Sequence, residues 1–232
     1  MFRPVTLTSL AVIVALACLH FLIFRPRRAA PTQQTALVRR LSLWERLVHA
    51  GLLLSVIGLV VTGWPGPLGL GFPLEDWMLM VHCTAGSVFA LSLMAGALTW
   101  ADASAFDKTD CDWVRKGGGS MLGRESLPAG RFDFAQKLLF WCTTTLGLAV
   151  LVTATLPLLK FFDTDQQVSL LRWHKISGLL LVLASLVHGY FALVARPGGW
   201  RLLISGKVST EWAKAYHSLW WHDVQEKERK QS

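Results

Sequence analysis

The chain has 232 residues, of which 53% are hydrophobic and 16% are charged, and its net charge is +8. The apolar residues gather in runs of about 20, the length that crosses a bilayer, so the composition indicates an integral helical membrane protein and excludes a soluble domain. Basic residues cluster just outside these runs, where they orient membrane helices, so the charge does not indicate nucleic-acid binding. The four cysteines form no C-x-x-C pair, which argues against a zinc ribbon, an iron–sulfur cluster and covalently attached haem.

Apolar runs that are long enough to span a bilayer lie at 5–24, 47–64, 76–100, 138–159 and 168–195. We therefore predict an all-α fold, a membrane bundle of five spans. The first run has only Arg3 before it and is longer than a typical signal-peptide core, so we expect an uncleaved anchor. This anchor adds one N-terminal helix to a four-helix core. His20 lies in this run without a histidine of matching phase elsewhere, and we interpret it as a satisfied or interfacial residue.

Lysine and arginine predict the orientation of the spans. The basic segments are 25–46, 101–137 and the tail after 195, and the connections 65–75 and 160–168 carry few or no basic residues. Because basic loops remain in the cytoplasm, the N-terminus is predicted outside and the C-terminus inside.

This orientation predicts a layout in four parts. The parts are an extra transmembrane helix at 1–28, a cytoplasmic basic linker at 29–43, a four-helix domain at 44–198 with the cytoplasmic loop 101–137, and a cytoplasmic tail at 199–232.

Four histidines in the last four runs are the candidate binding residues. His174 and His188 stand 14 positions apart, which places both rings on one helix face, about 21 Å apart along the axis. By the predicted orientation, His82 lies at the outer depth of His174, and His49 lies at the inner depth of His188. An ionisable group inside a membrane is costly, so its default interpretation is functional.

Two imidazoles per metal, in an apolar slot between helices, predict a six-coordinate b-type haem held without covalent attachment. The pairs His49/His188 and His82/His174 therefore predict two haem b groups stacked across the membrane, whose chemistry is outer-sphere electron transfer. Scattered structural histidines, a metal ion without a porphyrin and a transporter relay are the alternatives.

Two glycines extend this hypothesis. Gly86 and Gly178 each lie four residues after a histidine, on the same helix face, so we expect the flat macrocycle to lie against the backbone there. The alternative is ordinary helix–helix contact, which is also the interpretation of Gly51, Gly58 and Gly63.

Electrons in a membrane usually end on a quinone or come from one, and a quinone needs an apolar slot with hydrogen-bond donors and a supply of protons. Asp133, Gln136 and Lys137 offer such groups at the cytoplasmic entry of the fourth span. An ordinary polar helix start with Asp133 as its cap explains the same residues equally well.

The motifs that carry these residues resemble those of the formate dehydrogenase γ subunit family, diheme cytochrome b membrane anchors. The matching segments, within residues 40–230, are Glu45-Arg46-Leu-Val-His49 with Gly63, His82-Cys-Thr-Ala-Gly86, Gly130-Arg-Phe-Asp-Phe-Ala-Gln-Lys137 with Phe140-Trp141, His174-x-x-x-Gly178 with His188, and Gly206-Lys-Val-Ser-Thr-Glu-Trp-Ala-Lys214 with His217 and Trp220. The histidine spacing is shared with hydrogenase and thiosulfate reductase cytochromes b, and the tail favours formate dehydrogenase.

The resemblance implies a cytoplasmic haem at His49 and His188 and a periplasmic haem at His82 and His174. It also implies a quinone, menaquinone or ubiquinone, beside the cytoplasmic haem near His188 and the segment that ends at Asp133. The family commonly has Asn where this chain has Asp133, and the four-helix form has no counterpart of the first span.

The implied setting is the bacterial inner membrane, with this chain as the quinone-reducing subunit of an oxidoreductase complex. Formate is oxidised in a separate molybdenum or tungsten subunit, and electrons pass through an iron–sulfur subunit and two haems to quinone. The alternatives are a hydrogenase or thiosulfate reductase cytochrome b, and a haem-free structural membrane anchor.

Overall fold

The computed structural model describes residues 2–24, 36–66, 68, 74–118, 127–159, 161–195 and 200–231. Within these residues, the helices long and apolar enough to cross a membrane are α1 (Phe2–Phe24), α2 (Leu43–Gly63), α3 (Asp76–Trp100), α5 (Phe134–Thr155, continued by a 3₁₀ turn at Leu156–Leu158) and α6 (Thr164–Tyr190, continued by a π-helical turn at Phe191–Ala195). The predicted five spans are confirmed. Parts of the predicted segments lie outside the described residues: positions 25–28 of the first segment, 29–35 of the linker, most of the connection 65–75, 119–126 of the cytoplasmic loop, position 160 of the next connection, and positions 196–199 before the tail helices.

Helices α5 and α6 begin earlier than the apolar runs that predicted them, at Phe134 rather than 138 and at Thr164 rather than 168. A capping box precedes each helix. Gln136 donates its backbone N–H to the Asp133 carboxylate, at 2.9 Å, and accepts the Asp133 N–H, at 3.1 Å. Asp163 and Gln166 make the same exchange before α6, at 2.8 and 3.1 Å. These caps extend each helix through a polar first turn, which hydropathy does not detect.

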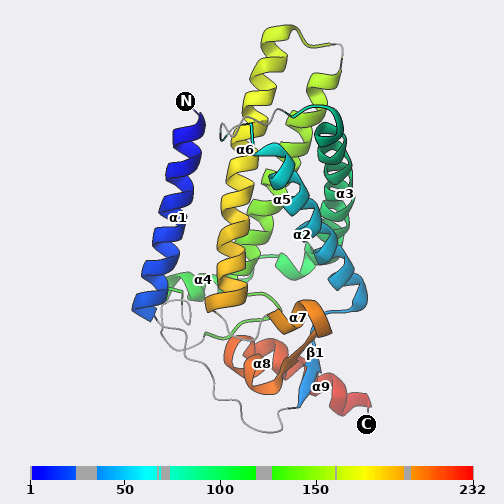
Figure 1. Cartoon of the computed structure of the whole chain (residues 1–232). Helices are drawn as coiled ribbons and strands as arrows, with labels where there is room; N and C mark the ends of the chain where they lie inside the picture. The colour runs from blue at the N-terminus through cyan, green and yellow to red at the C-terminus, as the bar shows by residue number, and fades with distance from the viewer. Residues whose placement is uncertain are drawn as a thin grey trace. The chain divides into compact units, whose positions relative to one another are not determined.

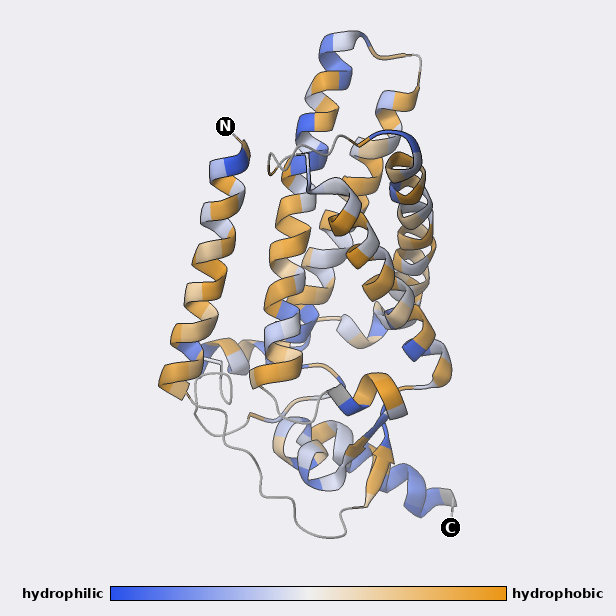
Figure 2. Ribbon diagram, in the orientation of Figure 1, coloured by the Kyte–Doolittle hydropathy of each residue, from blue (hydrophilic) through white to orange (hydrophobic). Residues whose placement is uncertain are grey.

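The chain divides into two compact units. The first, here called the membrane unit, comprises Met1–Ala17, Leu47–Thr99 and Cys142–His188. In it α2, α3, α5 and α6 run alongside one another (Figure 1), and most of their residues are hydrophobic (Figure 2). Its buried core is formed by Phe89, Val150 and Leu181. Leu181 lies seven residues from both His174 and His188, so by helix geometry this core lies midway between the two histidine levels.

Small residues allow close helix contacts in the membrane unit. A Cβ on Gly63 would lie 2.8 Å from Cε1 of His82, and a Cβ on Gly58 would lie 3.3 Å from Cβ of Ala85. Gly51 faces the Ser92 side chain in the same way. Helices α2 and α3 therefore meet along a glycine-lined face, as expected of helix contacts in lipid.

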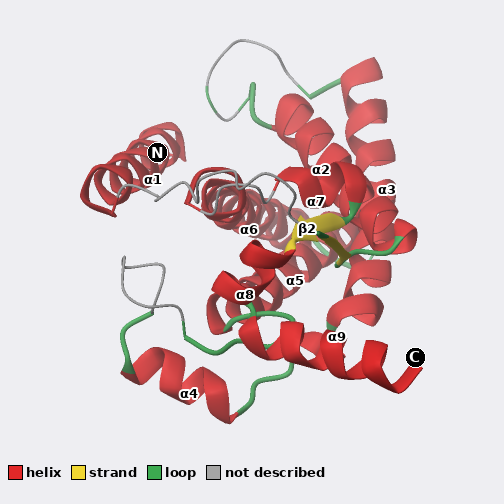
Figure 3. Cartoon of the chain, turned by 90° about the horizontal axis from the view of Figure 1, so that it is seen from below, coloured by secondary structure: helices red, strands yellow, loops and turns green. Residues whose placement is uncertain are grey.

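The second unit, here called the polar unit, comprises Cys18–Arg46, Trp100–Trp141 and Gly189–Ser232. Its elements are the end of α1, a 3₁₀ turn at Asp102–Ser104, α4 (Lys108–Arg115), α7 (Trp200–Ser205), α8 (Thr210–Tyr216), α9 (Ser218–Gln231), and the strands β1 (Leu37–Arg39) and β2 (Lys207–Ser209). The strands pair antiparallel, with Val38 opposite Val208 (Figure 3). This two-stranded sheet, which joins the linker to the tail, is absent from the sequence-based prediction.

A glycine turn connects α7 to β2 in the polar unit. Gly206 has a φ of +70°, which favours glycine, and a Cβ there would lie 2.5 Å from the Leu41 carbonyl oxygen. The Gly206 carbonyl accepts hydrogen bonds from the N–H groups of Arg40 and Leu41, at 2.8 and 3.0 Å. The linker and the tail are therefore held together at the end of the strand pair.

Candidate functional site

The four histidines singled out in the sequence form two pairs in the membrane unit. The rings of His49, on α2, and His188, on α6, have centroids 6.0 Å apart, with their planes at 41°. The rings of His82, on α3, and His174, on α6, have centroids 6.4 Å apart, with their planes at 75°. The structure thus brings together the residues that were paired by depth.

Hydrogen bonds orient both rings of the His82/His174 pair. The Nδ1 of His174 lies 3.0 Å from the carbonyl oxygen of Val150, and because a carbonyl only accepts, this nitrogen carries the proton. The Nδ1 of His82 lies 2.8 Å from the Thr62 hydroxyl, which itself donates to the Gly58 carbonyl at 2.7 Å and therefore accepts from the histidine. The Nδ1 partner thus selects the tautomer in which a neutral ring presents its Nε2 lone pair, the form that binds a metal ion.

The spacing of the rings fits a metal between them. An imidazole nitrogen lies about 2 Å from a bound metal and about 1 Å from its ring centroid, so two axial rings on one iron have centroids roughly 6 Å apart. The separations of 6.0 and 6.4 Å agree with this value. The Nδ1 of His49 is buried and has no hydrogen-bond partner among the described residues. The residues present therefore fit a bis-histidine haem at each level.

The two glycines predicted to face a macrocycle border open space. Among the residues that the structure describes, none outside the local helix backbone would lie within 4 Å of a Cβ on Gly178, and only Leu59, at 4.0 Å, would meet one on Gly86. Gly63 on α2, by contrast, is packed tightly against the His82 ring. Gly86 and Gly178 are thus not explained by helix contact, and their assignment to haem packing stays a prediction.

The residues assigned to a quinone lie at the start of α5, in the polar unit, and each has a protein partner. Asp133 and Gln136 cap the helix through each other. The Lys137 ammonium, only 4% exposed, donates to Asp107 at 2.8 Å and to Asp110 at 2.9 Å. The polar-helix-start interpretation therefore accounts for the contacts of all three residues. His188, which was assigned to the same site, belongs to the membrane unit.

The ion pair with Lys137 also sets the charge state of Asp107, the N-cap of α4. Burial alone would raise the pKa of Asp107, but hydrogen bonds from the Lys137 ammonium and from the side chain and backbone of Thr109 lower this pKa to about 2. Asp107 is therefore ionised throughout the physiological range, so the cluster of Asp107, Asp110 and Lys137 fastens α4 to α5.

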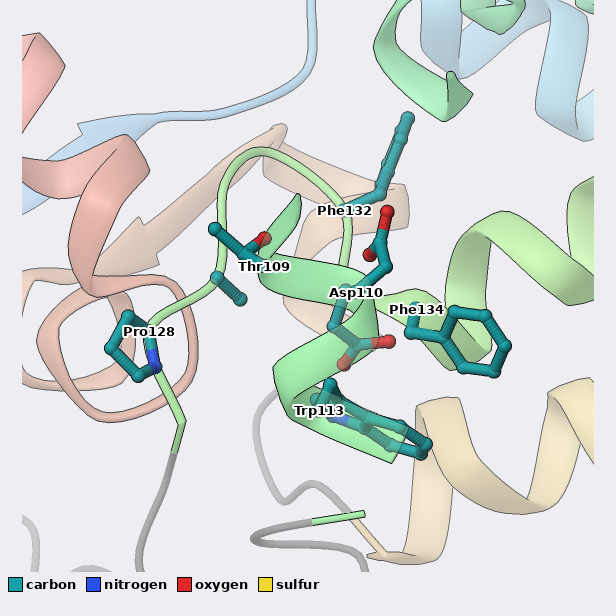
Figure 4. Close-up of a pocket in the computed structure, with 8 residues that line it drawn as sticks. Thr109, Asp110, Trp113, Pro128, Phe132 and Phe134 are labelled. Atoms are coloured by element: carbon teal, nitrogen blue, oxygen red, sulfur yellow. The ribbon is translucent and has the colours of Figure 1, made fainter. Parts of the chain in front are cut away.

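A small hollow lies beside this cluster (Figure 4). It leaves no room for a water molecule, and its lining residues are Thr109, Asp110, Trp113, Pro128, Ala129, Phe132, Asp133 and Phe134. The Phe134 ring contacts Trp113 and Phe106, at centroid distances of 5.3 and 5.8 Å. The walls are thus aromatic side chains with two carboxyl groups, Asp110 and Asp133, both 5% exposed.

Sequence reasoning missed two functional candidates in the polar unit, Arg40 and His217. Arg40 is 6% exposed and lies over the rings of Trp212 and Trp220, at 4.8 and 5.2 Å from their centroids. His217 is fully buried, and its Nδ1 lies 2.9 Å from the Gly130 carbonyl oxygen. The sequence signal was the high density of tryptophans around His217. It does not reveal the contacts, because His217 contacts Gly130, about 90 positions earlier, and the tryptophans contact Arg40, about 170 or more positions earlier.

His20, which the sequence analysis interprets as a satisfied or interfacial residue, has a hydrogen-bond partner far away in the sequence. Its Nδ1 lies 2.8 Å from the Tyr190 hydroxyl, and its ring contacts Phe24 and Phe191. The end of α1 therefore packs against the end of α6 within the polar unit.

The chain is similar in sequence to cytochrome b556 subunits of formate dehydrogenases. The nitrate-inducible formate dehydrogenase cytochrome b556(Fdn) subunit of Escherichia coli K12 is 26% identical over 175 residues, which cover 68% of this chain and 80% of that subunit. The formate dehydrogenase cytochrome b556(fdo) subunit of the same strain is 23% identical over 179 residues, covering 71% and 84%. The formate dehydrogenase cytochrome b556 subunit of Haemophilus influenzae is 27% identical over 149 residues, covering 62% of each chain.

The profile of a family described as prokaryotic cytochrome b561 matches residues 40–206, which is more than half of the chain and includes all four paired histidines. Such proteins hold haem b, and the five apolar helices agree with a multi-pass protein of the bacterial inner membrane. From the family match and the helical membrane bundle together, we conclude that this chain belongs to the prokaryotic cytochrome b561 family.

Proposed function

We propose that this chain is the cytochrome b subunit of a membrane-bound formate dehydrogenase, that it holds two b-type haems, and that it delivers electrons to quinone at its cytoplasmic side. The names of the three relatives support the choice of complex. The observation that carries the proposal is the pairing of four histidines as two facing pairs, 6.0 and 6.4 Å between centroids, on either side of an apolar core.

Each residue of the membrane unit has a defined part in this proposal. His49 and His188 hold the inner haem, and His82 and His174 hold the outer haem. Thr62 and the Val150 carbonyl keep Nε2 of His82 and His174 free to bind the iron. Gly86 and Gly178 leave room for the macrocycles. When bound, haems with two axial imidazoles supply one-electron transfer and leave no open site for substrate.

The partners follow from this chemistry. Because the chain's own site residues can only hold electron carriers, formate is oxidised in a separate molybdenum or tungsten subunit, and an iron–sulfur subunit passes the electrons to the outer haem. The extra helix α1 has no place in this path; its contact with Tyr190 supports a structural role.

We further propose that the quinone headgroup binds near the start of α5, because the segment 130–137 resembles the corresponding segment of the formate dehydrogenase γ subunits. In this proposal Asp133, which also caps α5, is the residue that exchanges a proton with a ring oxygen. Because Gln136 and Lys137 are engaged by other residues, they act here by shaping the site.

The test of the haem assignment is a reduced-minus-oxidised spectrum of the purified complex with haem quantification. We expect a b-type α band and two haems per chain. One haem per chain would refute the two-site assignment, and no band would leave the structural anchor. Metal analysis of the co-purified large subunit tests the partner: molybdenum or tungsten is expected, and nickel would indicate a hydrogenase instead.

The test of the quinone site compares two substitutions of Asp133. Asp133→Asn keeps a good helix cap but cannot carry a proton, whereas Asp133→Ala also loses the cap, at about 1 kcal/mol. We expect both variants to retain two haems and to reduce quinone at least tenfold more slowly. Unchanged turnover in Asp133→Asn would remove Asp133 from proton exchange.

A further inference from the structure

The two histidine pairs of the membrane unit differ in the hydrogen bonds of their rings. In the pair His82 and His174, here called the outer pair, both Nδ1 nitrogens have an acceptor on a neighbouring helix. His82 donates to the Thr62 hydroxyl of α2, at 2.8 Å, and His174 donates to the Val150 carbonyl of α5, at 3.0 Å. Each ring of the outer pair therefore has an acceptor on the nitrogen that does not bind a metal.

The pair His49 and His188, here called the inner pair, has no such acceptors among the residues that the structure describes. The Nδ1 of His49 is buried without a hydrogen-bond partner on another described residue. No hydrogen bond joins the His188 ring to a described residue either. The ring separations of the two pairs are nearly equal, 6.4 and 6.0 Å, so the pairs differ in hydrogen bonding rather than in spacing.

Thr62 is held as an acceptor by its own helix. Its hydroxyl donates to the Gly58 carbonyl at 2.7 Å, so its proton is used and a lone pair remains for the His82 N–H. Thr62 is only 5% exposed. The next residue, Gly63, lets the ring approach α2, since a Cβ there would lie 2.8 Å from Cε1 of His82. The dipeptide Thr62-Gly63 thus supplies both the acceptor and the room for the ring.

An acceptor on Nδ1 changes how strongly the other ring nitrogen donates electrons to a metal. Because the N–H bond is polarised toward the acceptor, the imidazole gains anionic character and becomes more basic at Nε2. A more basic axial ligand stabilises ferric iron more than ferrous iron, which lowers the reduction potential of a haem that it holds. Since the described residues give the outer pair two acceptors and the inner pair none, they favour a lower potential at the outer pair.

We propose that Thr62 is a positioning residue for the outer haem, and that it acts through His82, together with the Val150 carbonyl, to give this haem the lower reduction potential of the two. This order makes electron transfer from the outer to the inner level downhill. The role rests on the two-haem assignment proposed above. If Thr62 only packed α2 against α3, its substitution would change haem content without moving the potential of the haem that remains.

The experiment is a redox titration of the b-type α band in the whole purified complex, with haem quantification of each sample. Thr62→Val keeps the shape of the side chain and removes the acceptor, whereas Thr62→Ser retains a hydroxyl. Ser55→Ala is the matched control, because Ser55 lies two turns earlier on α2, is 3% exposed, and donates to the Leu52 carbonyl of its own helix, at 3.0 Å. His82→Ala assigns the potentials, since the inner haem should remain in it.

We expect two potentials in the native complex, of which the higher one remains in His82→Ala. Thr62→Val should keep two haems and raise the lower potential by about 59 mV, a tenfold change in the ratio of reduced to oxidised haem, while the higher potential stays constant. Thr62→Ser should return the lower potential to near its native value. Ser55→Ala should match the native complex in both potentials.

An unchanged lower potential in Thr62→Val, equal shifts in the Val and Ser variants, or retention of the lower potential in His82→Ala would overturn the proposal. If Thr62→Val loses the outer haem, Thr62→Cys replaces it, because a thiol is a weaker acceptor of similar shape. A native lower potential in that variant would equally overturn the proposal. Fewer than two haems in the native complex would instead refute the two-haem assignment, so the two failures are distinguishable.

Discussion

The two units of this chain are held together in different ways. In the membrane unit, most side-chain hydrogen bonds go back to the same helix, as when Thr153 and Ser185 donate to carbonyls one turn earlier. In the polar unit, side chains connect segments far apart in the sequence, such as Arg40 with Arg131 and Lys137 with Asp107. The membrane unit has a small buried core, whereas much of the polar unit's interior is charged or aromatic.

This contrast indicates what each unit depends on. Within a bilayer, lipid is as apolar as the helices, so packing between helices gains little from burial, and a group bound between them contributes much of the cohesion. The polar unit fixes its shape through buried ion pairs and hydrogen bonds, which specify one arrangement. Loss of a ligand should therefore affect the first unit most, and loss of a charge the second.

The largest effect is expected from removing one histidine of a pair. His82→Ala should abolish the outer haem and leave the inner one, because His49 and His188 do not contact it, so haem content falls to half. His188→Ala should remove the inner haem instead. Pyridine haemochrome quantification with redox titration identifies the remaining haem, and loss of the inner haem alone in His82→Ala would contradict the pairing.

Removing the buried cation tests the polar unit. Lys137→Met leaves the Asp110 carboxylate buried without its partner, which should destabilise this unit by roughly 3 kcal/mol. Proteolysis of the 101–118 segment in detergent should accelerate, while haem content remains native. The double variant with Asp110→Asn should recover part of the loss, since no unpaired charge remains; no recovery would mean that the pair is not what fastens α4.

A smaller effect is expected at the open glycines. Gly178→Ala adds a methyl group that meets no other described residue within 4 Å beyond the local helix backbone, so the chain without haem should fold as before. If a macrocycle lies there, haem affinity should fall by about tenfold, a loss of roughly 1.4 kcal/mol. Equal haem affinity in the variant and the native protein would show that nothing flat occupies that space.

The smallest effect is expected when the pH is lowered. Because the pKa of Asp107 is lowered to about 2 in the folded chain, its contribution to stability is complete above its ordinary pKa of 3.8 and is lost as the pH falls toward 2. Proteolytic resistance of the 101–118 segment should therefore decline over this interval. In Asp107→Asn that part of the decline should disappear, and a native-like acid profile in the variant would assign it to other carboxyl groups.

The spans were predictable because lipid requires about 20 apolar residues for each helix, and the basic loops between them carry orientation signals that are equally local. The pairing of His82 with His174 followed from spacing and orientation, both readable along the chain. The starts of α5 and α6 were less accurate, since caps such as Asp133 with Gln136 are polar and look like loop residues.

The predicted quinone residues show where local reasoning stops. From the sequence, Lys137 was predicted to be an available hydrogen-bond donor. In the structure its ammonium donates to Asp107 and Asp110, which lie 30 and 27 positions away. Nothing in the sequence around His217 indicates that its hydrogen-bond partner is Gly130. The sheet between linker and tail was missed for the same reason, because strands of three residues carry almost no pattern.

The sequence by itself therefore determined the number of spans and indicated which histidines form pairs, because these depend on the spacing of residues along each helix and on the thickness of the bilayer. Only the tertiary structure decided which carbonyls the tail holds, which acids neutralise Lys137 and which glycines border open space. Those outcomes depend on contacts between segments that are distant in the chain, and the free energy of such a contact is not encoded in either segment alone.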